Sequence, residues 1–120
     1  MQATKSRKEL MNEIIANNYG TSAYHKLSPF SPVLCTDGVT QMAKELGAFW
    51  LVDAITSYNR REPFQVWTLE VKEGPKAVLT MREDSDQPAK VTQKIGCTDF
   101  PEGLWAFYLI DGILMLTSEY

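Results

Sequence analysis

The residues best suited to chemistry lie in one short segment, at Tyr24, His25, Cys35 and Asp37, which includes the chain's only histidine. A histidine near a carboxylate can act as a general base, because the carboxylate orients and stabilises the imidazole. Tyr24, His25 and Asp37 are therefore the candidates for a small ligand site or a catalytic site. The competing interpretation is a surface histidine that only makes hydrogen bonds.

The two cysteines, Cys35 and Cys97, lie 62 positions apart without a Cys-x-x-Cys pair. With His25 and Asp37 they would make a poor zinc set, since structural zinc sites use closely spaced cysteine and histidine ligands. We predict no metal, and no cofactor, because no phosphate-binding glycine loop or nucleophile motif occurs. We expect free, buried thiols in a reducing cytoplasm. A nucleophilic Cys35 assisted by His25 stays open.

A second candidate region is the helical stretch "FWLVDAITSY", residues 49–58. On a helical wheel, Asp53 falls opposite the apolar stripe, where Arg60 or a serine one turn on could pair with it. Phe49 and Trp50 share that polar side and need cover, either from the first helix and the following linker or from a partner protein. A catalytic Asp53 is a further alternative. The candidate partner-binding residues are aromatic or charged: Phe49, Trp50, Asp53, Arg60, Trp105 and Phe107.

The charge balance argues against some partners. A formal net charge of -3 makes nucleic acid an unexpected partner, since such proteins present a basic face. The alternative would use Arg60, Arg61, Lys90 and Lys94. No apolar run approaches the length of a membrane span, and the start of the chain lacks the apolar core of a signal peptide. We expect a cytoplasmic protein without membrane contact.

The first half of the chain is expected to consist of two helical regions joined by a linker. Ser6 and Glu9 form a capping box that starts a helix, and Gly20 is expected to stop it. A proline-containing linker follows. The next helical region starts at Thr36 or Asp37 and is expected to run to Pro63. Gly47 either breaks this region or lets another element pass close by.

From residue 64 onward the apolar period changes to two, which indicates strands. Five are expected, at residues 64–71, 77–83, 90–96, 104–110 and 113–118, with a turn at residues 72–76 and a hairpin turn at Asp111-Gly112. This order predicts an α+β fold in which N-terminal helices pack on one face of an antiparallel meander of about five strands. We expect a single domain over residues 1–120, with residues 1–5 flexible.

The last hairpin is apolar on both faces, and one layer of helices covers only one face of a sheet. We therefore expect an exposed patch around Trp105, Phe107 and Met115, which two copies would bury in a homodimer. The competing expectation is that the linker "YHKLSPFSPV", residues 24–33, folds over this patch within one chain.

Several segments together resemble an uncharacterised family of short bacterial and phage proteins, a domain of unknown function. They are "GTSAYHK", "CTDGVTQMAKELGAFWLVDAITSY", "PFQVWTLEV", "CTDFP" and "FYLIDGILMLTSEY", covering about Gly20 to Tyr120. The resemblance carries no functional residues over, but it implies a small phage or mobile-element accessory protein. We therefore predict a non-enzymatic protein-binding module that inhibits or regulates a host complex, such as a defence complex. The alternative is a ligand-binding domain or enzyme that uses Tyr24, His25 and Asp37.

Overall fold

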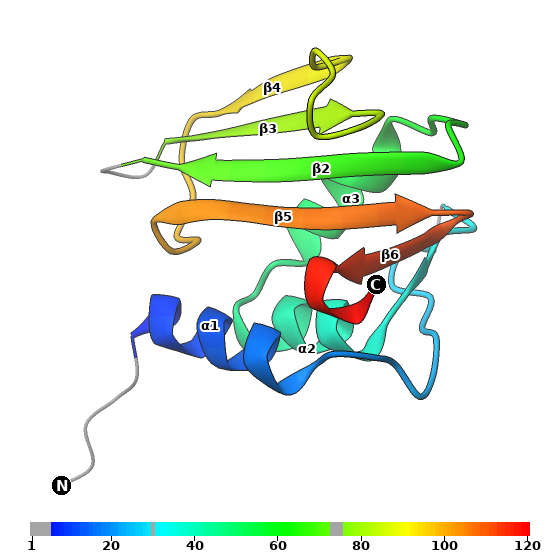
Figure 1. Cartoon of the computed structure of the whole chain (residues 1–120). Helices are drawn as coiled ribbons and strands as arrows, with labels where there is room; N and C mark the ends of the chain where they lie inside the picture. Colours follow the sequence, from blue (N-terminus) through cyan, green and yellow to red (C-terminus); the bar gives the residue numbers. More distant parts are fainter. Residues whose placement is uncertain (1–5, 30, 73–75) are drawn as a thin grey trace, which may run out of the picture.

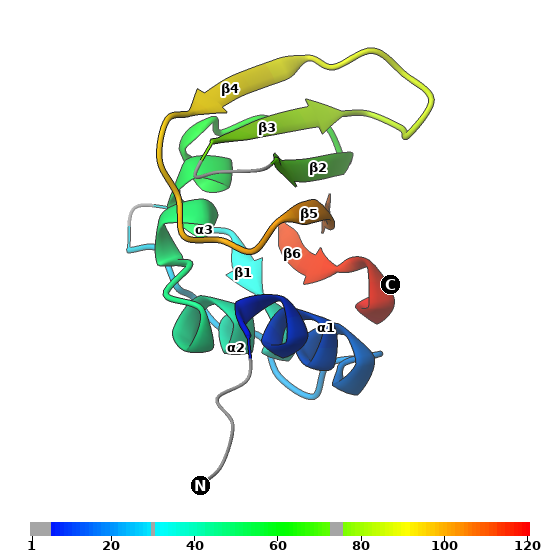
Figure 2. The ribbon, with the colours of Figure 1, turned by 90° about the vertical axis from the view of Figure 1, so that its left-hand side faces the viewer.

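The computed structural model describes residues 6–29, 31–72 and 76–120. A six-stranded sheet in the order β1-β6-β5-β2-β3-β4 carries three helices on one face (Figures 1 and 2), which confirms the predicted α+β class. The elements are α1 (Arg7–Asn17), β1 (Leu34–Cys35), α2 (Asp37–Glu45), α3 (Phe49–Ser57), β2 (Phe64–Val71), β3 (Ala77–Arg82), β4 (Val91–Ile95), β5 (Gly103–Ile110), β6 (Ile113–Leu116) and the short 3-10 helix η1 (Thr117–Glu119). Residues 1–5 and most of the predicted turn at 72–76 lie outside the described residues.

The first helix starts where the capping signal predicts and ends earlier than expected. The Ser6 hydroxyl accepts a hydrogen bond from the Glu9 backbone N–H at 3.1 Å. At the other end, Asn18 donates from its side chain to the Ile14 carbonyl at 2.8 Å and so satisfies an open helix carbonyl. The helix therefore ends before Gly20, and the prediction that Gly20 stops it is wrong.

Gly47 breaks the second helical region into α2 and α3. Its φ is +63°, which favours glycine, and a Cβ built there would have no atom within 4 Å. Gly47 therefore serves the backbone conformation rather than a close approach of another element. The α3 helix ends at Ser57, not at Pro63, and Asn59 follows with a φ of +50°.

The sheet contains one strand more than predicted. β1 pairs in parallel with β6, and Cys35 of β1 also exchanges two backbone hydrogen bonds with His25 of the linker. A two-residue strand shows no period, so the sequence could not reveal it. β5 pairs with β2, so the segment 96–102 carries the chain from one edge of the sheet past β3 and β2. The turn at Asp111-Gly112 has positive φ at both residues, 49° and 81°, as predicted.

The two faces of the sheet differ from expectation at β5. Trp105 and Phe107 are 7% and 0% exposed and belong to the core beneath the helices. The expectation that they form an exposed patch is therefore wrong: it is Leu104, together with Tyr108, that points to the other face. Consecutive residues lie on opposite faces of a strand, so the exposed patch is displaced by one residue along β5.

The linker does not cover this other face. Ser28 and Ser31 line a hollow with residues of α3, and His25 is bound to the β1 edge. The linker therefore lies on the helix side of the sheet (Figure 2). None of the helices in the described ranges is long and apolar enough to cross a membrane.

Candidate functional site

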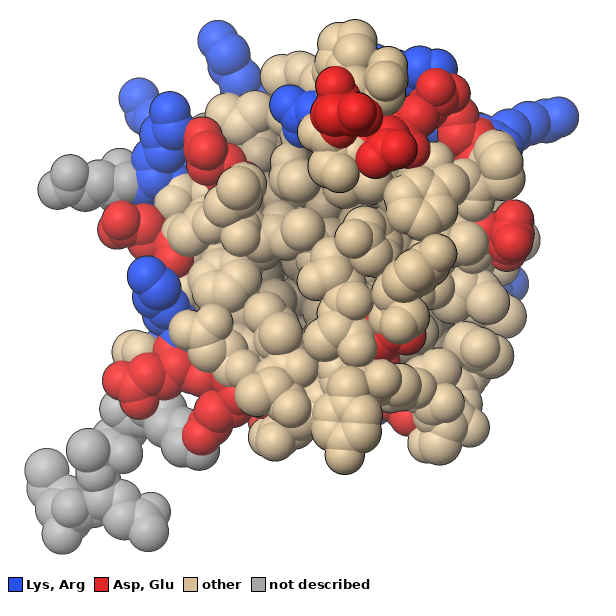
Figure 3. All heavy atoms as spheres, in the orientation of Figure 1, with Lys and Arg blue, Asp and Glu red and all other residues tan. Residues whose placement is uncertain are grey.

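The most distinctive surface is the sheet face opposite the helices, which we call the open face. Figure 3 shows this side of the molecule, where uncharged side chains predominate and most charged side chains lie toward the periphery. Leu104 is 65% exposed there, although large aliphatic side chains are normally buried. The open face consists of alternate residues of five strands: Phe64, Val66, Thr68 and Glu70 of β2; Val78, Thr80 and Arg82 of β3; Thr92 and Lys94 of β4; Leu104, Ala106, Tyr108 and Ile110 of β5; and Ile113 and Met115 of β6.

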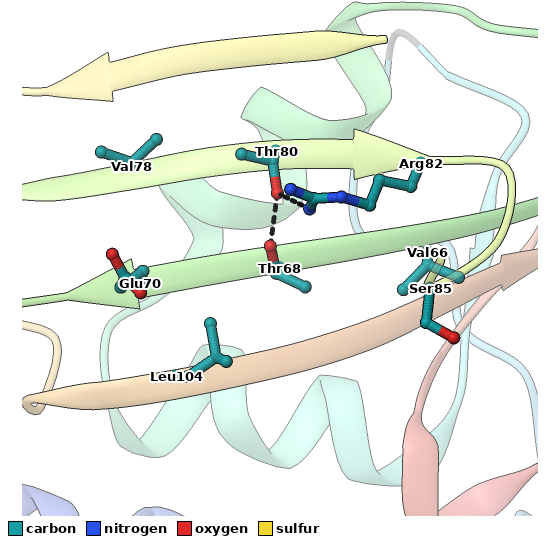
Figure 4. A pocket seen from close by; sticks show the side chains of 8 residues that line it. All are labelled: Val66, Thr68, Glu70, Val78, Thr80, Arg82, Ser85 and Leu104. Atoms are coloured by element: carbon teal, nitrogen blue, oxygen red, sulfur yellow. Dashed lines mark hydrogen bonds between the residues drawn. The ribbon is translucent and has the colours of Figure 1, made fainter. Parts of the chain in front are cut away.

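A hollow of about 430 Å³ lies on the β2–β3 part of the open face. Thr68 and Thr80 face each other across the two strands and share a hydrogen bond between their hydroxyl groups. The Arg82 guanidinium lies along the face and donates to the Thr80 hydroxyl at 2.8 Å. Glu70 stands at the opposite end of the hollow (Figure 4), about half exposed and 3.5 Å from the Lys72 ammonium. The hollow is shallow and suits a protein surface better than an enclosed small molecule.

The predicted ligand site is partly assembled. Nε2 of His25 lies 2.8 Å from Oδ1 of Asp37, and Oδ2 accepts from both the backbone N–H and the hydroxyl of Ser22. The hydrogen bond with His25, and then those from Ser22, hold the pKa of the Asp37 carboxyl well below its usual range. Tyr24 is 54% exposed. Because both carboxylate oxygens are bound by the chain itself, this cluster ties the linker to the start of α2.

The cysteines differ in environment. Cys35 is buried, and burial raises the pKa of its thiol to about 12, which disfavours the thiolate needed of a nucleophile. Cys97 is exposed, so the expectation of two buried thiols is wrong for this residue, and both cysteines are free. In the described part of the chain, no group of three or more His, Cys, Asp or Glu side chains could hold a metal ion.

The candidate residues of α3 differ in burial and in contacts. Trp50 is half-buried and packs edge-on against Phe100, with ring centroids 6.5 Å apart, so its cover comes from the loop before β5. Phe49 is 42% exposed. Asp53 is exposed beside the linker, and its expected partner Arg60 instead binds Glu62 through Nε at 3.0 Å.

That Arg60–Glu62 pair belongs to a surface charge network. The hydrogen bond to Glu62 raises the pKa of Arg60, and Lys90 binds Glu83 at 2.7 Å. Arg60 and Lys90, two of the four basic residues considered as a nucleic-acid surface, are therefore paired with carboxylates of the same chain. Asp53 and Arg60 lie away from the open face, and they do not form one site with it.

A contact that the sequence analysis missed joins the end of the chain to α2. The Glu119 carboxylate accepts from the Thr36 hydroxyl at 2.6 Å, from the Gly38 N–H at 3.1 Å and from the Leu116 N–H at 3.0 Å. A negative charge is favourable there, because the helix N-terminus presents unpaired N–H groups. A Cβ on Gly38 would lie 2.7 Å from Oε1 of Glu119, so glycine permits this approach.

Comparison with known proteins identifies the class. A model of a family of unknown function, DUF6876, matches residues 9–120, and the chain belongs to this family. The match confirms the resemblance to an uncharacterised domain and extends it toward α1. No curated protein matches the chain, and no solved structure does.

Proposed function

We propose that this chain is a non-catalytic protein-binding module whose binding surface is the open face. The observation that carries the proposal is the exposure of apolar side chains, above all Leu104, on a sheet face that α1, α2 and α3 leave uncovered and that Tyr120 contacts at Tyr108 and Phe64. A sheet normally buries its apolar face against another layer, and large apolar patches mark interaction sites. The hollow beside Thr68 and Thr80 adds hydrogen-bonding groups that would fix the orientation of a bound surface.

The setting we propose is cytoplasmic. The resemblance to short phage and bacterial proteins favours a small accessory protein that regulates or inhibits a host complex, such as a defence complex. The second candidate function is a ligand site or catalytic site at Tyr24, His25 and Asp37, and the His25–Asp37 contact at 2.8 Å favours it. The saturation of Asp37 by donors of its own chain supports a structural role more strongly.

Site-specific photo-crosslinking in the cells that produce the chain tests the proposal. A photoreactive amino acid replaces Leu104 on the open face or, as a control, the exposed Lys44 of α2. We expect a defined protein product from position 104 and none from position 44. The proposal fails if position 104 yields no protein product, or if both positions yield the same products. Mass spectrometry of the product identifies the bound protein.

A further inference from the structure

Resting on the proposed function, we infer that the protein bound by the open face is a second copy of this chain, in a twofold dimer held by reciprocal Arg82–Glu70 ion pairs. The inference starts from the charges of the face. Among residues 6–29, 31–72 and 76–120, no carboxylate pairs with Arg82, whose described partner is the Thr80 hydroxyl. The half-buried guanidinium of Arg82 is therefore available to pair with an acidic group of another chain, and burial of the face against that chain would favour such a pair.

The acidic group that fits is on the same face. In the β2–β3 register, Val66 lies opposite Arg82, Thr68 opposite Thr80, and Glu70 opposite Val78. Arg82 therefore lies two residues from Thr80 on β3, and Glu70 lies two residues from Thr68 on β2, on the opposite side of the threonine pair. Strand rise and spacing put their Cα atoms about 14 Å apart. Within the described residues the two side chains do not pair, since Arg82 binds Thr80 and Glu70 pairs with Lys72.

A twofold axis solves this geometry. The required axis runs parallel to the two open faces and midway between them, at right angles to the direction from Arg82 to Glu70, and passes over the midpoint between these two residues. Each Arg82 then meets the partner's Glu70. The threonine pair lies between Arg82 and Glu70 within one chain (Figure 4), so both threonine pairs would lie near the axis. An isologous interface needs such a self-complementary patch, because each surface must fit its own copy. A foreign partner would have to supply a carboxylate and a cation at these same positions.

The remainder of the face agrees with a copy as the occupant. Uncharged side chains such as Leu104 and Tyr108 would meet uncharged side chains, as in two sheets packed face to face about 10 Å apart. The modest net charge of -3 per chain opposes association only weakly. Glu70 has one described partner, the exposed Lys72 at 3.5 Å, and such surface pairs exchange at little cost. In the dimer the helices stay outside, with Phe49 free for a host protein.

Two single charge reversals give a decisive test by sedimentation equilibrium. Arg82→Glu alone places two like charges at each contact, and so does Glu70→Arg alone. Each variant is therefore expected to raise the dimer dissociation constant by about 100-fold. An equimolar mixture of the two variants restores both pairs, since the arginine at position 70 meets the glutamate at position 82 and the native Glu70 meets the native Arg82. The mixture is expected to form heterodimers with nearly wild-type affinity, which an effect within one chain could not produce.

The wild-type chain is expected to have a mass that rises with concentration toward twice 13.6 kDa. Circular dichroism confirms that each variant is folded, and Leu104→Asp is a second variant that should dissociate the dimer, with Leu34→Asp on the β1 edge as its control. A wild-type mass of 13.6 kDa at every concentration would overturn the inference. A mixture that stays monomeric beside a dimeric wild type would overturn it as well.

The two proposals fail separately. If the wild type is monomeric and position 104 crosslinks to another protein, the open face binds a protein that is not a copy. If position 104 crosslinks to nothing, both proposals fail.

Discussion

Replacement of Glu119 by alanine is expected to destabilise the fold far more than its position next to the end of the chain suggests. The carboxylate accepts three hydrogen bonds, from Thr36, Gly38 and Leu116, and all three contacts are partly buried. Loss of an acceptor for charge-assisted bonds costs about 1.5–3 kcal/mol each in buried sites, and less with partial exposure. The interaction with the α2 N-terminus adds about 0.5 kcal/mol. Since such contributions overlap, we expect a total loss of about 2–4 kcal/mol.

Urea and thermal unfolding followed by far-UV circular dichroism measure this loss. At about 4 °C per kcal/mol for a chain of this size, the midpoint temperature should fall by roughly 8–16 °C. Glu102→Ala is the matched control, because Glu102 is exposed in the loop before β5, and its effect should stay within about 0.5 kcal/mol. A loss below about 0.5 kcal/mol for Glu119→Ala would refute the anchoring of α2 by the end of the chain. Gly38→Ala should also destabilise the chain, and less so when Glu119 is absent, because the added Cβ would conflict with the Glu119 side chain as well as with Leu116.

Three further predictions follow from burial and charge. Phe107→Ala should cost about 3–5 kcal/mol in urea unfolding and Leu104→Ala less than about 1 kcal/mol, and the reverse order would contradict the assignment of the two faces. Asp37→Asn should lower the free energy of unfolding at neutral pH. Because the folded-state pKa of Asp37 is lowered, the difference in free energy of unfolding between variant and wild type should shrink as pH falls below about 4. A difference that grows toward acid pH would contradict this. Native protein treated with a thiol reagent at pH 8 should be modified at Cys97 and protected at Cys35 until urea is added, and equal labelling rates would disprove the burial.

Local patterns were sufficient for most elements. The Ser6 cap, the break at Gly47 and the Asp111-Gly112 turn each depend on neighbouring residues, and all three lie where the sequence indicates. The β2 strand has the predicted bounds, residues 64–71, because an alternating pattern reports the strand directly.

The contacts between distant segments could not be predicted in this way. The alternating pattern shows which residues of β5 share a face. Because both faces of β5 are apolar, the pattern cannot show that the helices cover Phe107 rather than Leu104. The Glu119–Thr36 bond joins residues 83 positions apart, and no local signal marks it. The His25–Asp37 pair could be proposed from the sequence because the two residues are only 12 positions apart.

Hydroxyl-radical footprinting of the open face tests the protein-binding role most directly, since it needs no knowledge of the partner. The oxidation of Leu104 and Tyr19 is compared between the chain in its producing cells and the dilute purified chain. Both side chains are exposed in the isolated chain, at 65% and 83%, and only Leu104 lies on the open face. We predict that Leu104 is protected in cells while Tyr19 is oxidised as in the dilute chain. Oxidation of Leu104 at the same relative rate in both conditions would contradict a binding role for the open face.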